Sequence, residues 1–405
     1  MKKVVVIGQG YVGLPLAVSI ASSGFEVIGY DLNEEVANDL NLGKSHIEDI
    51  SDFALAKLIG SKSYKASSDA HDLSDCEIAI IAVPTPLDSG RQPDLSFVKS
   101  AAEILGKYLT KRTLIINEST SYPGTLRNII SPIVLRNSIP TVEHLFAISP
   151  ERVDPGNLEW NIKTTPRLFS GLTPEATLAT RDFYSAFCDD IVEVSTPEVA
   201  ESAKLFENTF RQVNIALVNE FALIMRGMGI PVHEVLEAAG SKPYGFMKFT
   251  PGIGVGGHCI PVDPSYLAYS AKNSGVEPRF IELANEVNLH MPRMIAQRVA
   301  TENGGSLNDK SVLICGIAYK SNVSDTRESP AETLLLELEK MGAIVSWHDP
   351  LVSSWNNSKS TELNSQSFDV TILTTLHDSM NLDQIRKSAK YFFDCTGKVL
   401  GANTL

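Results

Sequence analysis

The chain has 405 residues, of which 43% are hydrophobic and 20% charged, so it is long enough for two or three globular domains, each with its own core. Its formal net charge of −13 argues against nonspecific binding to nucleic acid or to anionic membranes, because both depend on a basic surface. The sequence contains no stretch of about 20 uninterrupted apolar residues, so we expect no membrane-spanning helix. A small anionic ligand remains compatible with this charge, since it needs only a local basic pocket.

The cysteines are scattered and form no CxxC pair, and the histidines have no metal-ligand spacing. This pattern predicts a reducing compartment, no disulfide framework and no metal site. The apolar start of the chain is broken by Gly-Gln-Gly, which is typical of a strand, turn and helix rather than of a signal peptide. We therefore expect a cytoplasmic enzyme.

Residues 4–7 form a short run of β-branched residues, as expected of a buried parallel strand. Gly8, Gly10 and Gly13 follow it in the spacing GxGxxG and precede a helical pattern. This motif between a strand and a helix predicts a dinucleotide site, because its glycines let the backbone approach a pyrophosphate at the helix N-terminus.

Asp31 ends the next predicted strand, residues 26–30, where an acidic side chain can accept hydrogen bonds from a ribose diol. Glu34 and Glu35 follow it, and no basic residue lies beside them. A 2′-phosphate would meet carboxylates here, so the sequence predicts NAD rather than NADP as the cofactor.

Further strands alternate with helical patterns, which predicts a doubly wound parallel sheet. We place these strands at residues 78–83, 113–117, 145–149 and 168–170. Ligands of such sheets bind at the carboxyl ends of the strands. The polar segments that fall there are residues 83–86, 118–120 and 149–152, although each of them is also compatible with an ordinary loop.

A long helix is predicted from Thr196-Pro197 to about Arg226. Lys204, Asn208 and Arg211 lie on one face of it, at positions i, i+4 and i+7. Such a row is usually a solvated stripe. Here the apolar flanking residues predict a largely buried helix whose polar row lines a pocket; they are Leu205, Phe206, Ile215 and Leu217.

The loop at residues 252–264, GIGVGGHCIPVDP, is rich in glycine and proline and contains Cys259. Neighbouring side chains of an extended backbone point apart, so His258 and Cys259 are not expected to form a direct dyad. A thiol on a glycine-rich loop, with Asp263 close behind it, is a candidate covalent nucleophile.

A helix at residues 279–301 ends in the turn at residues 303–305, and an α/β pattern then restarts, with strands at residues 312–317, 343–347, 370–373 and 391–394. Lys320 and Arg327 lie before a helix that begins at Ser329-Pro330, a combination that suits a diphosphate but also fits an exposed basic loop. The predicted fold is α/β: a Rossmann-type domain (1–195), a helical middle domain (196–302) and a smaller Rossmann-like domain (303–405).

These motifs together resemble the UDP-glucose/GDP-mannose dehydrogenase family over nearly the whole chain. The shared motifs are GxGxxG with Asp31, Val-Pro-Thr-Pro at 83–86 with Pro93-Asp94, Ser119-Thr120, Ser-Pro-Glu at 149–151, Lys204 with Asn208, Gly-Gly-x-Cys with Pro261 and Asp263, and Lys320 with DxRxSP at 325–330. The resemblance implies an NAD-binding domain, a middle domain that commonly forms a homodimer, and a C-terminal domain that holds the nucleotide of a UDP-sugar.

The resemblance also implies a reaction, in which two NAD oxidise the C6 alcohol of a nucleotide sugar to a carboxylate through a thiohemiacetal and a thioester on Cys259. Lys204 would stabilise the oxyanion, Asn208 would hold substrate or oxyanion, and Asp263 would assist proton transfer. Thr120 and Glu151 match positions that contact the nicotinamide, the substrate or the hydrolytic water. Cofactor contacts implied in this way are Tyr11, Val12, Asp31 and Thr85; implied substrate contacts are Arg152, Val153, Arg211, Gly254, Tyr319, Lys320 and Arg327.

Two positions depart from the pattern of UDP-glucose enzymes. Those enzymes usually carry Lys directly before the Asp that corresponds to Asp263, and often a second Glu in the segment that follows Ser-Pro-Glu. Val262 and Pro155 stand at these places and resemble the branch that acts on UDP-N-acetylhexosamines. We therefore expect UDP-N-acetylglucosamine or an epimer as substrate. The alternatives are a UDP-glucose 6-dehydrogenase, a two-electron dehydrogenase, or a non-catalytic nucleotide-sugar binder on the same scaffold; an intact Cys259 favours the enzyme with covalent chemistry.

Overall fold

The computed structural model describes all residues except 1, 154–156, 158, 258 and 364–366. The chain forms two compact units, Met1–Glu207 and Asn208–Leu405, and each is described by itself. Helix α7 (Pro197–Gly227) contains the boundary between them. The expected division into three domains stays a prediction. Among the described residues, no helix is both long and apolar enough to cross a membrane.

The first unit contains a sheet with the strand order β3-β2-β1-β4-β5-β6-β7-β8. Its strands are β1 (Lys3–Ile7), β2 (Glu26–Tyr30), β3 (Tyr64–Ser67), β4 (Ile78–Ile81), β5 (Leu114–Asn117), β6 (Leu145–Ile148), β7 (Arg167–Gly171) and β8 (Ile191–Glu193). β6 and β7 pair antiparallel, a departure from the expected parallel order, whereas β1 pairs parallel with both β2 and β4. After β1 the chain forms β2 and β3 on one side of that strand and then returns to form β4 on its other side. A topological switch point therefore lies between β1 and β4.

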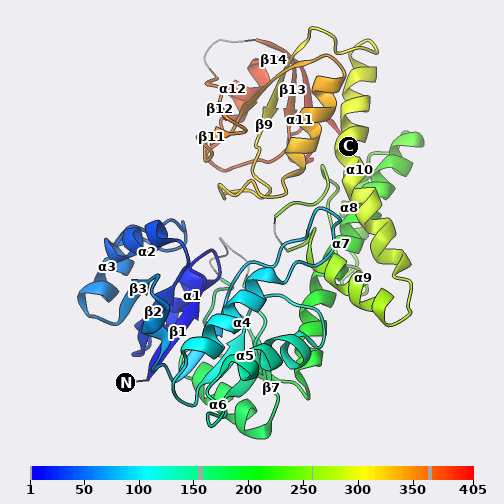
Figure 1. The fold of residues 1–405 in the computed structure, drawn as a ribbon. Helices are drawn as coiled ribbons and strands as arrows, with labels where there is room; N and C mark the ends of the chain where they lie inside the picture. The colour runs from blue at the N-terminus through cyan, green and yellow to red at the C-terminus, as the bar shows by residue number, and fades with distance from the viewer. Residues whose placement is uncertain (1, 154–156, 158, 258, 364–366) are drawn as a thin grey trace. The chain divides into compact units, whose positions relative to one another are not determined.

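Helices cover this sheet because its strands are apolar on both faces; Val4, Val5 and Val6 of β1 are completely buried. The helices and helical turns are α1 (Gly13–Ser22), α2 (Glu34–Asn41), α3 (Asp52–Gly60), η1 (Ala70–Leu73), α4 (Ser96–Tyr108), η2 (Leu126–Ile130), α5 (Ser131–Asn137) and α6 (Pro174–Tyr184). α4 and α5 pack side by side (Figure 1). The predicted doubly wound fold class is confirmed for this unit.

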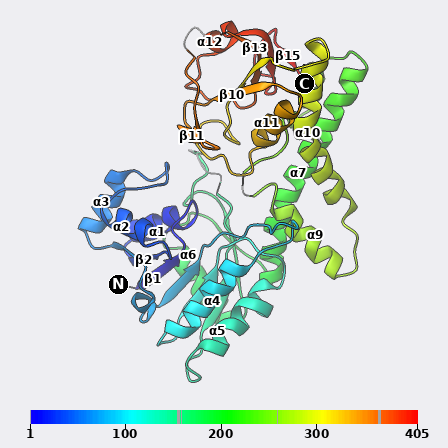
Figure 2. The same ribbon diagram turned by 45° about the horizontal axis from the view of Figure 1, so that its top comes forward.

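The second unit begins with helices: the rest of α7, then α8 (Val232–Gly240), α9 (Asp263–Asn273) and α10 (Arg279–Glu302). α7 and α10 run beside each other (Figure 2), and the buried Asn219 side-chain amide of α7 donates a hydrogen bond to Asn288 of α10. The expectation that the apolar flanks of α7 are buried is wrong for Phe206 and Leu217, which are 65% and 64% exposed, while Leu205 is buried. A long helix presents several faces, and this one leaves an apolar face uncovered in the single chain.

The second unit ends with a parallel sheet of strand order β10-β9-β13-β14-β15, which has its own switch point between β9 and β13. Its elements are β9 (Ser311–Cys315), α11 (Pro330–Lys340), β10 (Ile344–His348), β13 (Phe368–Leu373), α12 (Leu382–Lys387), β14 (Ala389–Asp394) and β15 (Asn403–Thr404). A short ribbon of β11 (Ser354–Trp355) and β12 (Ser358–Lys359) follows β10. The predicted second, smaller Rossmann-like sheet is therefore confirmed.

Candidate active site

The glycines after β1 divide into two that pack closely and one that is open. A Cβ on Gly8, whose φ is +91°, would lie 2.4 Å from the carbonyl oxygen of Ala82, and one on Gly13 would lie 1.8 Å from that of Gly8. A Cβ built on Gly10 meets no described atom within 4 Å. Gly8 and Gly13 thus let strand and helix approach, while Gly10 leaves backbone accessible to a ligand at the start of α1, which fits a pyrophosphate.

Asp31 is fixed at the end of β2. Its Oδ2 accepts a hydrogen bond from the N–H of Gln9 at 2.9 Å, and its Oδ1 accepts one from the N–H of Asn33 at 2.9 Å. The buried Gln9 side chain is held in turn by the Tyr64 hydroxyl, at 2.8 Å, and by the Val6 carbonyl, at 2.9 Å. This partly exposed, oriented carboxylate beside the glycine loop fits the ribose diol of a dinucleotide.

The loops after β4 and β5 are tied to each other at the same edge of the sheet. The Ser119 hydroxyl accepts from the Val83 N–H and donates to the Val83 carbonyl, each at 2.9 Å. Thr85 is buried and Thr120 is partly buried, whereas Tyr11, on the glycine loop, is more exposed. The first unit thus assembles the predicted cofactor residues at the carboxyl ends of β1, β2, β4 and β5.

A buried carboxylate on α7 holds the loop that follows Thr120. Glu201 accepts from the backbone N–H groups of Gly124, at 2.6 Å, and Leu126, at 3.1 Å. Burial raises the pKa of Glu201 to about 7 in spite of these donors. Lys204, one turn further along α7, is also buried and is among the groups that lower the pKa of Glu151.

The segment after β6 carries Glu151, Arg152 and Val153. The Arg152 guanidinium contacts Glu207 at 2.6 Å and donates to the Pro166 carbonyl at 2.8 Å. The N–H of Val153 donates to Glu151. The substrate contacts predicted for Arg152 and Val153 stay predictions, and Pro155 lies outside the described residues.

In the second unit, the start of the Cys259 loop is anchored on two helices. The Gly252 N–H donates to Asn219 of α7 at 2.9 Å, and Asn219 donates to Asn288 of α10 at 3.0 Å. Gly254 has a φ of +125°, and a Cβ there would lie 2.7 Å from the Asn288 carbonyl oxygen. Glycine is therefore required at 254 both by conformation and by space.

The loop then packs against the segment that carries the predicted nucleotide contacts. Gly257, with a φ of +80°, donates its N–H to the Arg327 carbonyl at 3.0 Å, and a Cβ there would lie 2.7 Å from the Tyr319 ring. A Cβ on Gly256 would lie 2.8 Å from Tyr319 and 2.9 Å from Pro330. His258 lies outside the described residues.

Cys259 is exposed, and its carbonyl forms the turn that opens α9. It accepts from the N–H of Val262 at 3.2 Å and from that of Asp263 at 2.8 Å. The Asp263 carboxylate is buried and accepts from Asn208 at 2.5 Å. The second unit therefore brings Asn208 and Asp263 together at the helix that Cys259 precedes, while Arg211 is exposed on α7.

Lys320 and Arg327 follow β9, at the switch point of the C-terminal sheet. Lys320 is partly buried, and the more exposed Arg327 pairs with Asp325 at 2.6 Å. The Ser329 hydroxyl caps α11 by accepting from the Ala331 N–H at 3.3 Å. A basic segment before a capped helix, at the carboxyl end of a parallel strand, is a suitable place for a diphosphate.

Family models match three successive segments of the chain. All three describe the UDP-glucose/GDP-mannose dehydrogenase family: its NAD binding domain matches residues 2–188, its central domain residues 198–290 and its UDP binding domain residues 313–400. The chain belongs to this family. The predictions of a nucleotide-sugar 6-dehydrogenase and of NAD as its cofactor are confirmed at the level of the family.

Relatives in the family cover most of the chain. A UDP-N-acetyl-D-mannosamine dehydrogenase of Pyrococcus horikoshii is 34% identical over 397 residues, 96% of this chain and 93% of that protein. A UDP-N-acetyl-D-glucosamine 6-dehydrogenase of Pseudomonas aeruginosa is 36% identical over 358 residues, 87% of this chain and 83% of that protein. The solved structure of a UDP-D-ManNAc dehydrogenase from Pyrococcus horikoshii has a TM-score of 0.89 at 32% identity, covering 99% of this chain and 98% of that one.

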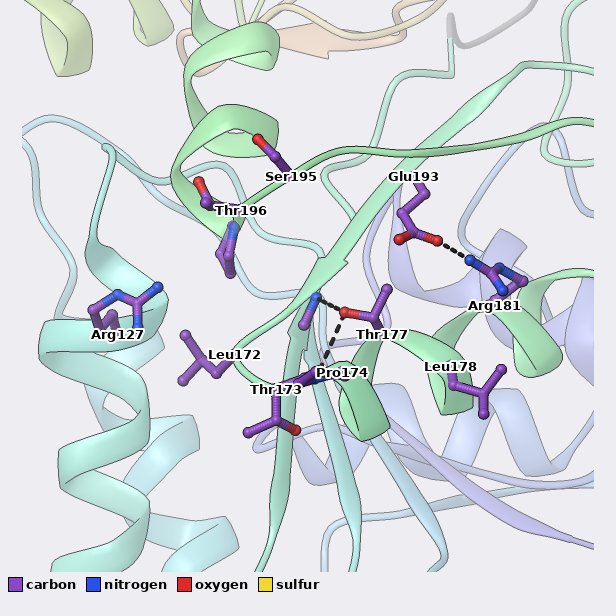
Figure 3. Close-up of a pocket in the computed structure, with 12 residues that line it drawn as sticks. Arg127, Leu172, Thr173, Pro174, Thr177, Leu178, Arg181, Glu193, Ser195 and Thr196 are labelled. Atoms are coloured by element: carbon purple, nitrogen blue, oxygen red, sulfur yellow. Dashed lines mark hydrogen bonds and ion pairs between the residues drawn. The ribbon is translucent and has the colours of Figure 1, made fainter.

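A separate pocket of about 400 Å³ lies in the first unit between the starts of α6 and α7 (Figure 3). Arg127 and Arg181 belong to its lining, and each is paired with a glutamate, Glu198 and Glu193 respectively. The described residues that line it include none of the predicted site residues. We therefore do not assign the dehydrogenase reaction to this pocket.

In each unit, sequence reasoning missed the residues that support the loops carrying the predicted site residues. Glu201, Asn219 and Asn288 lie on helices far along the chain from the loops they anchor. Glu118 was included only as part of the segment 118–120, and Arg167 falls just outside the strand predicted at 168–170. No local pattern marks such partners, because each contact joins elements that are distant in sequence.

Proposed function

We propose that this family member carries out the NAD-dependent four-electron oxidation of the C6 alcohol of a UDP-N-acetylhexosamine to the uronic acid, with UDP-N-acetylglucosamine or an epimer as substrate. The observation that carries the proposal is the packing of the exposed Cys259 loop on Tyr319 and the Arg327 segment through Gly256 and Gly257. The thiol that we propose as the nucleophile is therefore on a loop that packs against the segment covered by the UDP-binding model.

The substrate class rests on the loop sequences and on the relatives. Val262 and Pro155 stand where UDP-glucose enzymes usually carry Lys and Glu. The relatives described above are named for N-acetylmannosamine and N-acetylglucosamine nucleotides. Both epimers are therefore tested, and UDP-glucose is the comparison substrate.

The first unit binds and orients the cofactor. NAD, when bound, supplies the hydride acceptor for both oxidations. The open backbone at Gly10 receives the pyrophosphate, and Asp31 accepts hydrogen bonds from the ribose hydroxyls. Glu34 and Glu35, exposed at the start of α2, disfavour a 2′-phosphate at the same place, so NADP is the poorer cofactor.

Cys259 acts on the aldehyde formed by the first oxidation. Its sulfur bonds to the carbonyl carbon and a proton goes to the carbonyl oxygen, which gives a thiohemiacetal that can be oxidised further. Loss of two electrons and two protons leaves a thioester. A water then bonds to the acyl carbon while the carbon–sulfur bond breaks, so the acid and the thiol are released.

Other side chains support these steps in the proposal. Lys204 offsets charge on the oxyanion, and Asn208, bonded to Asp263, holds substrate or oxyanion while Asp263 assists proton transfer. Thr120 and Glu151 act on the nicotinamide, the substrate or the water. Removal of one such electrostatic contact typically costs about 10²–10³ in kcat.

The proposal includes a homodimer. Large apolar side chains are exposed along α7 and α10, among them Leu217, Phe280, Leu283 and Leu289. Exposed large apolar side chains on neighbouring helices favour a protein interface as their covering. Light scattering after size exclusion will give the mass of a dimer or a higher oligomer if the proposal is correct, and the mass of one chain if it is wrong.

The proposed compartment is the cytoplasm. The structure joins no two of its described cysteines in a disulfide; they are Cys76, Cys188, Cys259, Cys315 and Cys395. Cys259 has to stay reduced to act as a nucleophile, and a reducing compartment keeps it so.

The test of the function is a turnover panel of UDP-hexoses and UDP-N-acetylhexosamines with NAD, in which NADH and product are both counted. We expect two NADH per sugar, the uronic acid as product and faster turnover of an N-acetylhexosamine. Cys259→Ala should fold normally and lose acid formation by several orders of magnitude. One NADH per sugar in the unmodified protein, or normal acid formation by Cys259→Ala, would refute the covalent mechanism. A clear preference for UDP-glucose would overturn only the substrate class.

A further inference from the structure

A buried arginine lies between two carboxylates at the carboxyl ends of β5 and β6. The Arg167 side chain, at the start of β7, is 4% exposed. Its Nη1 lies 2.9 Å from Glu118 Oε2, and its Nη2 lies 3.0 Å from Glu151 Oε2. One guanidinium thus serves two acidic groups, of which only Glu151 belongs to the predicted site.

The guanidinium is held in place on its other sides. The Tyr184 ring lies 4.8 Å from the guanidinium carbon, and the Tyr184 hydroxyl donates to Glu118. Arg167 also donates to the Ser149 hydroxyl, at 3.3 Å. The Glu118 side chain is completely buried, so this arrangement is screened from solvent and fixes the direction in which Arg167 points.

Glu151 is fixed from both oxygens. Oε2 contacts Arg167, and Oε1 accepts from the backbone N–H groups of Arg152, at 2.6 Å, and Val153, at 2.5 Å. Its side chain remains 13% exposed, so the carboxylate is oriented by buried donors while part of it stays accessible. A carboxyl held in this way has one orientation to offer to a substrate or a water.

Arg167 acts to lower the pKa of both carboxyls, yet their pKa values are shifted in opposite directions. Burial raises the pKa of Glu118 to about 7, and repulsion from Glu151 adds to burial against the pull of Arg167. Burial also acts to raise the pKa of Glu151, but Arg167, the Val153 N–H and Lys204 outweigh it, so that pKa lies below its ordinary value. Pairs of acids whose pKa values are pushed apart are typical of sites that need one of them ionised.

We propose that Arg167 is the positioning residue of Glu151: together with Glu118 and Tyr184, it keeps Glu151 as an oriented carboxylate for the reaction. The inference rests on the proposed function, in which Glu151 acts on the substrate or the hydrolytic water. An ionised Glu151 can accept a proton from a water that attacks the thioester, whereas a protonated one cannot.

A purely structural ion cluster is the competing explanation. Buried ion pairs often contribute little to stability, yet breaking one leaves a charge without a partner and destabilises the fold. Such a role predicts a less stable protein whose remaining activity keeps its pH dependence. A positioning role predicts that the pH dependence itself changes.

The charged groups around Glu151 come from several elements. Arg167 faces it from β7, Glu118 from the end of β5 and Lys204 from α7, while Tyr184 of α6 donates to Glu118. The neighbouring Arg152 guanidinium is engaged by Glu207. Removal of Arg167 alone would leave Glu118 and Glu151 facing each other, so the decisive variant changes Glu118 as well.

The experiment compares the pH profile of kcat for the unmodified enzyme, the double variant Arg167→Met with Glu118→Gln, and Arg167→Lys. The double variant removes the positive charge of Arg167 together with the Glu118 carboxyl, so Glu151 is not left facing a second acid that has lost its partner. We expect the acid limb of its profile to move up by about one pH unit or more, with kcat recovering at alkaline pH and the KM values for NAD and UDP-sugar changing by less than about threefold. Arg167→Lys should show a smaller shift in the same direction, because it keeps the charge but loses the forked geometry.

The matched control is Arg181→Met, which removes a surface arginine paired with Glu193 and should leave the profile unchanged. An unshifted profile or an equal loss of kcat at every pH in the double variant would overturn the inference, and Arg167→Lys decides in the same way if the double variant does not fold. Failure of the proposed function is distinguishable, because the unmodified enzyme would then form no uronic acid before any variant is compared.

Discussion

The two sheets of the chain are built alike at the end of their first strand. Gly8 follows β1 and Gly316 follows β9, with φ values of +91° and +81°. Each glycine N–H donates at 2.8 Å to the carbonyl of the last residue of the neighbouring strand, Tyr30 in one sheet and His348 in the other. A Cβ on Gly8 would clash with the backbone of Ala82, which follows β4, and one on Gly316 with the backbone of Thr375, which follows β13. Both sheets therefore need a glycine at the end of their first strand.

The likeness extends to the acid that follows the neighbouring strand. Asp31 accepts from the N–H of Gln9, the residue after Gly8, at 2.9 Å. Asp349 accepts from the N–H of Ile317, the residue after Gly316, also at 2.9 Å. In both sheets, therefore, an aspartate carboxylate accepts a hydrogen bond from the backbone N–H of the residue that follows the glycine.

The two acids differ in what surrounds them. Asp31 is partly exposed, whereas Asp349 is 2% exposed and contacts His377 Nε2 at 3.1 Å. His377 Nδ1 accepts from the Asn322 N–H at 2.8 Å, so the ring proton is on Nε2 and points to Asp349. The same position is thus open to solvent in one sheet, where we propose that it meets the ribose of NAD, and holds the segment that carries Lys320 in the other. Burial of the acid, rather than its place in the fold, decides between these uses.

The largest expected effect is on stability in the C-terminal sheet. Asp349→Ala should lower the free energy of unfolding by about 3 kcal/mol or more, because buried N–H donors and the His377 ring lose a charged acceptor. Chemical denaturation monitored by circular dichroism measures it. The control is Asp378→Ala, an exposed neighbour bonded to Asn322. If both variants lowered the free energy of unfolding by the same small amount, Asp349 would not be the structural support that distinguishes the C-terminal sheet.

The next effect is on cofactor affinity in the N-terminal sheet. Asp31→Ala should weaken NAD binding by about 10–100-fold, since charged hydrogen bonds to the ribose are lost. It should also narrow the preference for NAD over NADP. Isothermal titration calorimetry measures both affinities, with Asp39→Ala, which removes a surface partner of Lys44, as control. Unchanged NAD affinity, or NADP bound as well as NAD by the unmodified protein, would contradict the assignment of Asp31.

A smaller effect concerns acid pH. Burial acts to raise the pKa of Asp349, but His377 and the N–H groups of Leu351 and Ala318 outweigh it and hold the pKa below its ordinary value. Its stabilising contribution is therefore complete above the unfolded pKa of about 3.9 and is lost as the pH falls through the lower folded value. The stability gap between the unmodified protein and Asp349→Asn should narrow in that window by at most about 1.4 kcal/mol per pH unit. A gap that stays constant on acidification would mean that the folded and unfolded pKa values are equal.

The smallest expected effect tests whether the residues that support the cofactor loop act independently of those that support the nucleotide site. Tyr64→Phe removes the hydroxyl that holds Gln9 and should cost about 1 kcal/mol of stability. It should raise the KM for NAD by about two- to fivefold, because Gln9 orients Asp31, and leave UDP affinity unchanged. Steady-state kinetics and UDP titration measure the two. A change in UDP affinity as large as that in the KM for NAD would argue against separate supports.

The parts of the fold that sequence predicted are those with local signals. The apolar run of β1, the glycines after it and the acid after β2 lie close together in the chain and report the backbone geometry directly. β3 and β8 lack the apolar run of the other strands: β3 reads Tyr-Lys-Ala-Ser, and β8 reads Ile-Val-Glu with two exposed residues. The sequence predicts a buried apolar face on α7, because composition alone does not distinguish apolar side chains that are buried in the core from those that stay exposed on one chain.

The candidate site divides in the same way. Cys259, Asp263 and Asn208 are predicted from the sequence, because the glycine-rich loop and the polar row on α7 are local patterns, and the structure shows Asn208 bonded to Asp263. Arg167 was not, since its two carboxylate partners come from the ends of other strands and only the folded sheet brings them together. Supporting residues of this kind can be identified only in the structure, because their role depends on the partners that they contact.

The most direct test of covalent catalysis is mass spectrometry of the Cys259 peptide after acid quench during turnover with NAD and a UDP-N-acetylhexosamine. Glu151→Gln, which should slow hydrolysis, provides the variant in which the intermediate accumulates. We predict an added mass equal to the acyl group of the UDP-linked uronic acid on the peptide that contains Cys259, rising and then decaying as acid forms. An unmodified Cys259 at every time point, while two NADH are produced per sugar, would contradict the covalent mechanism.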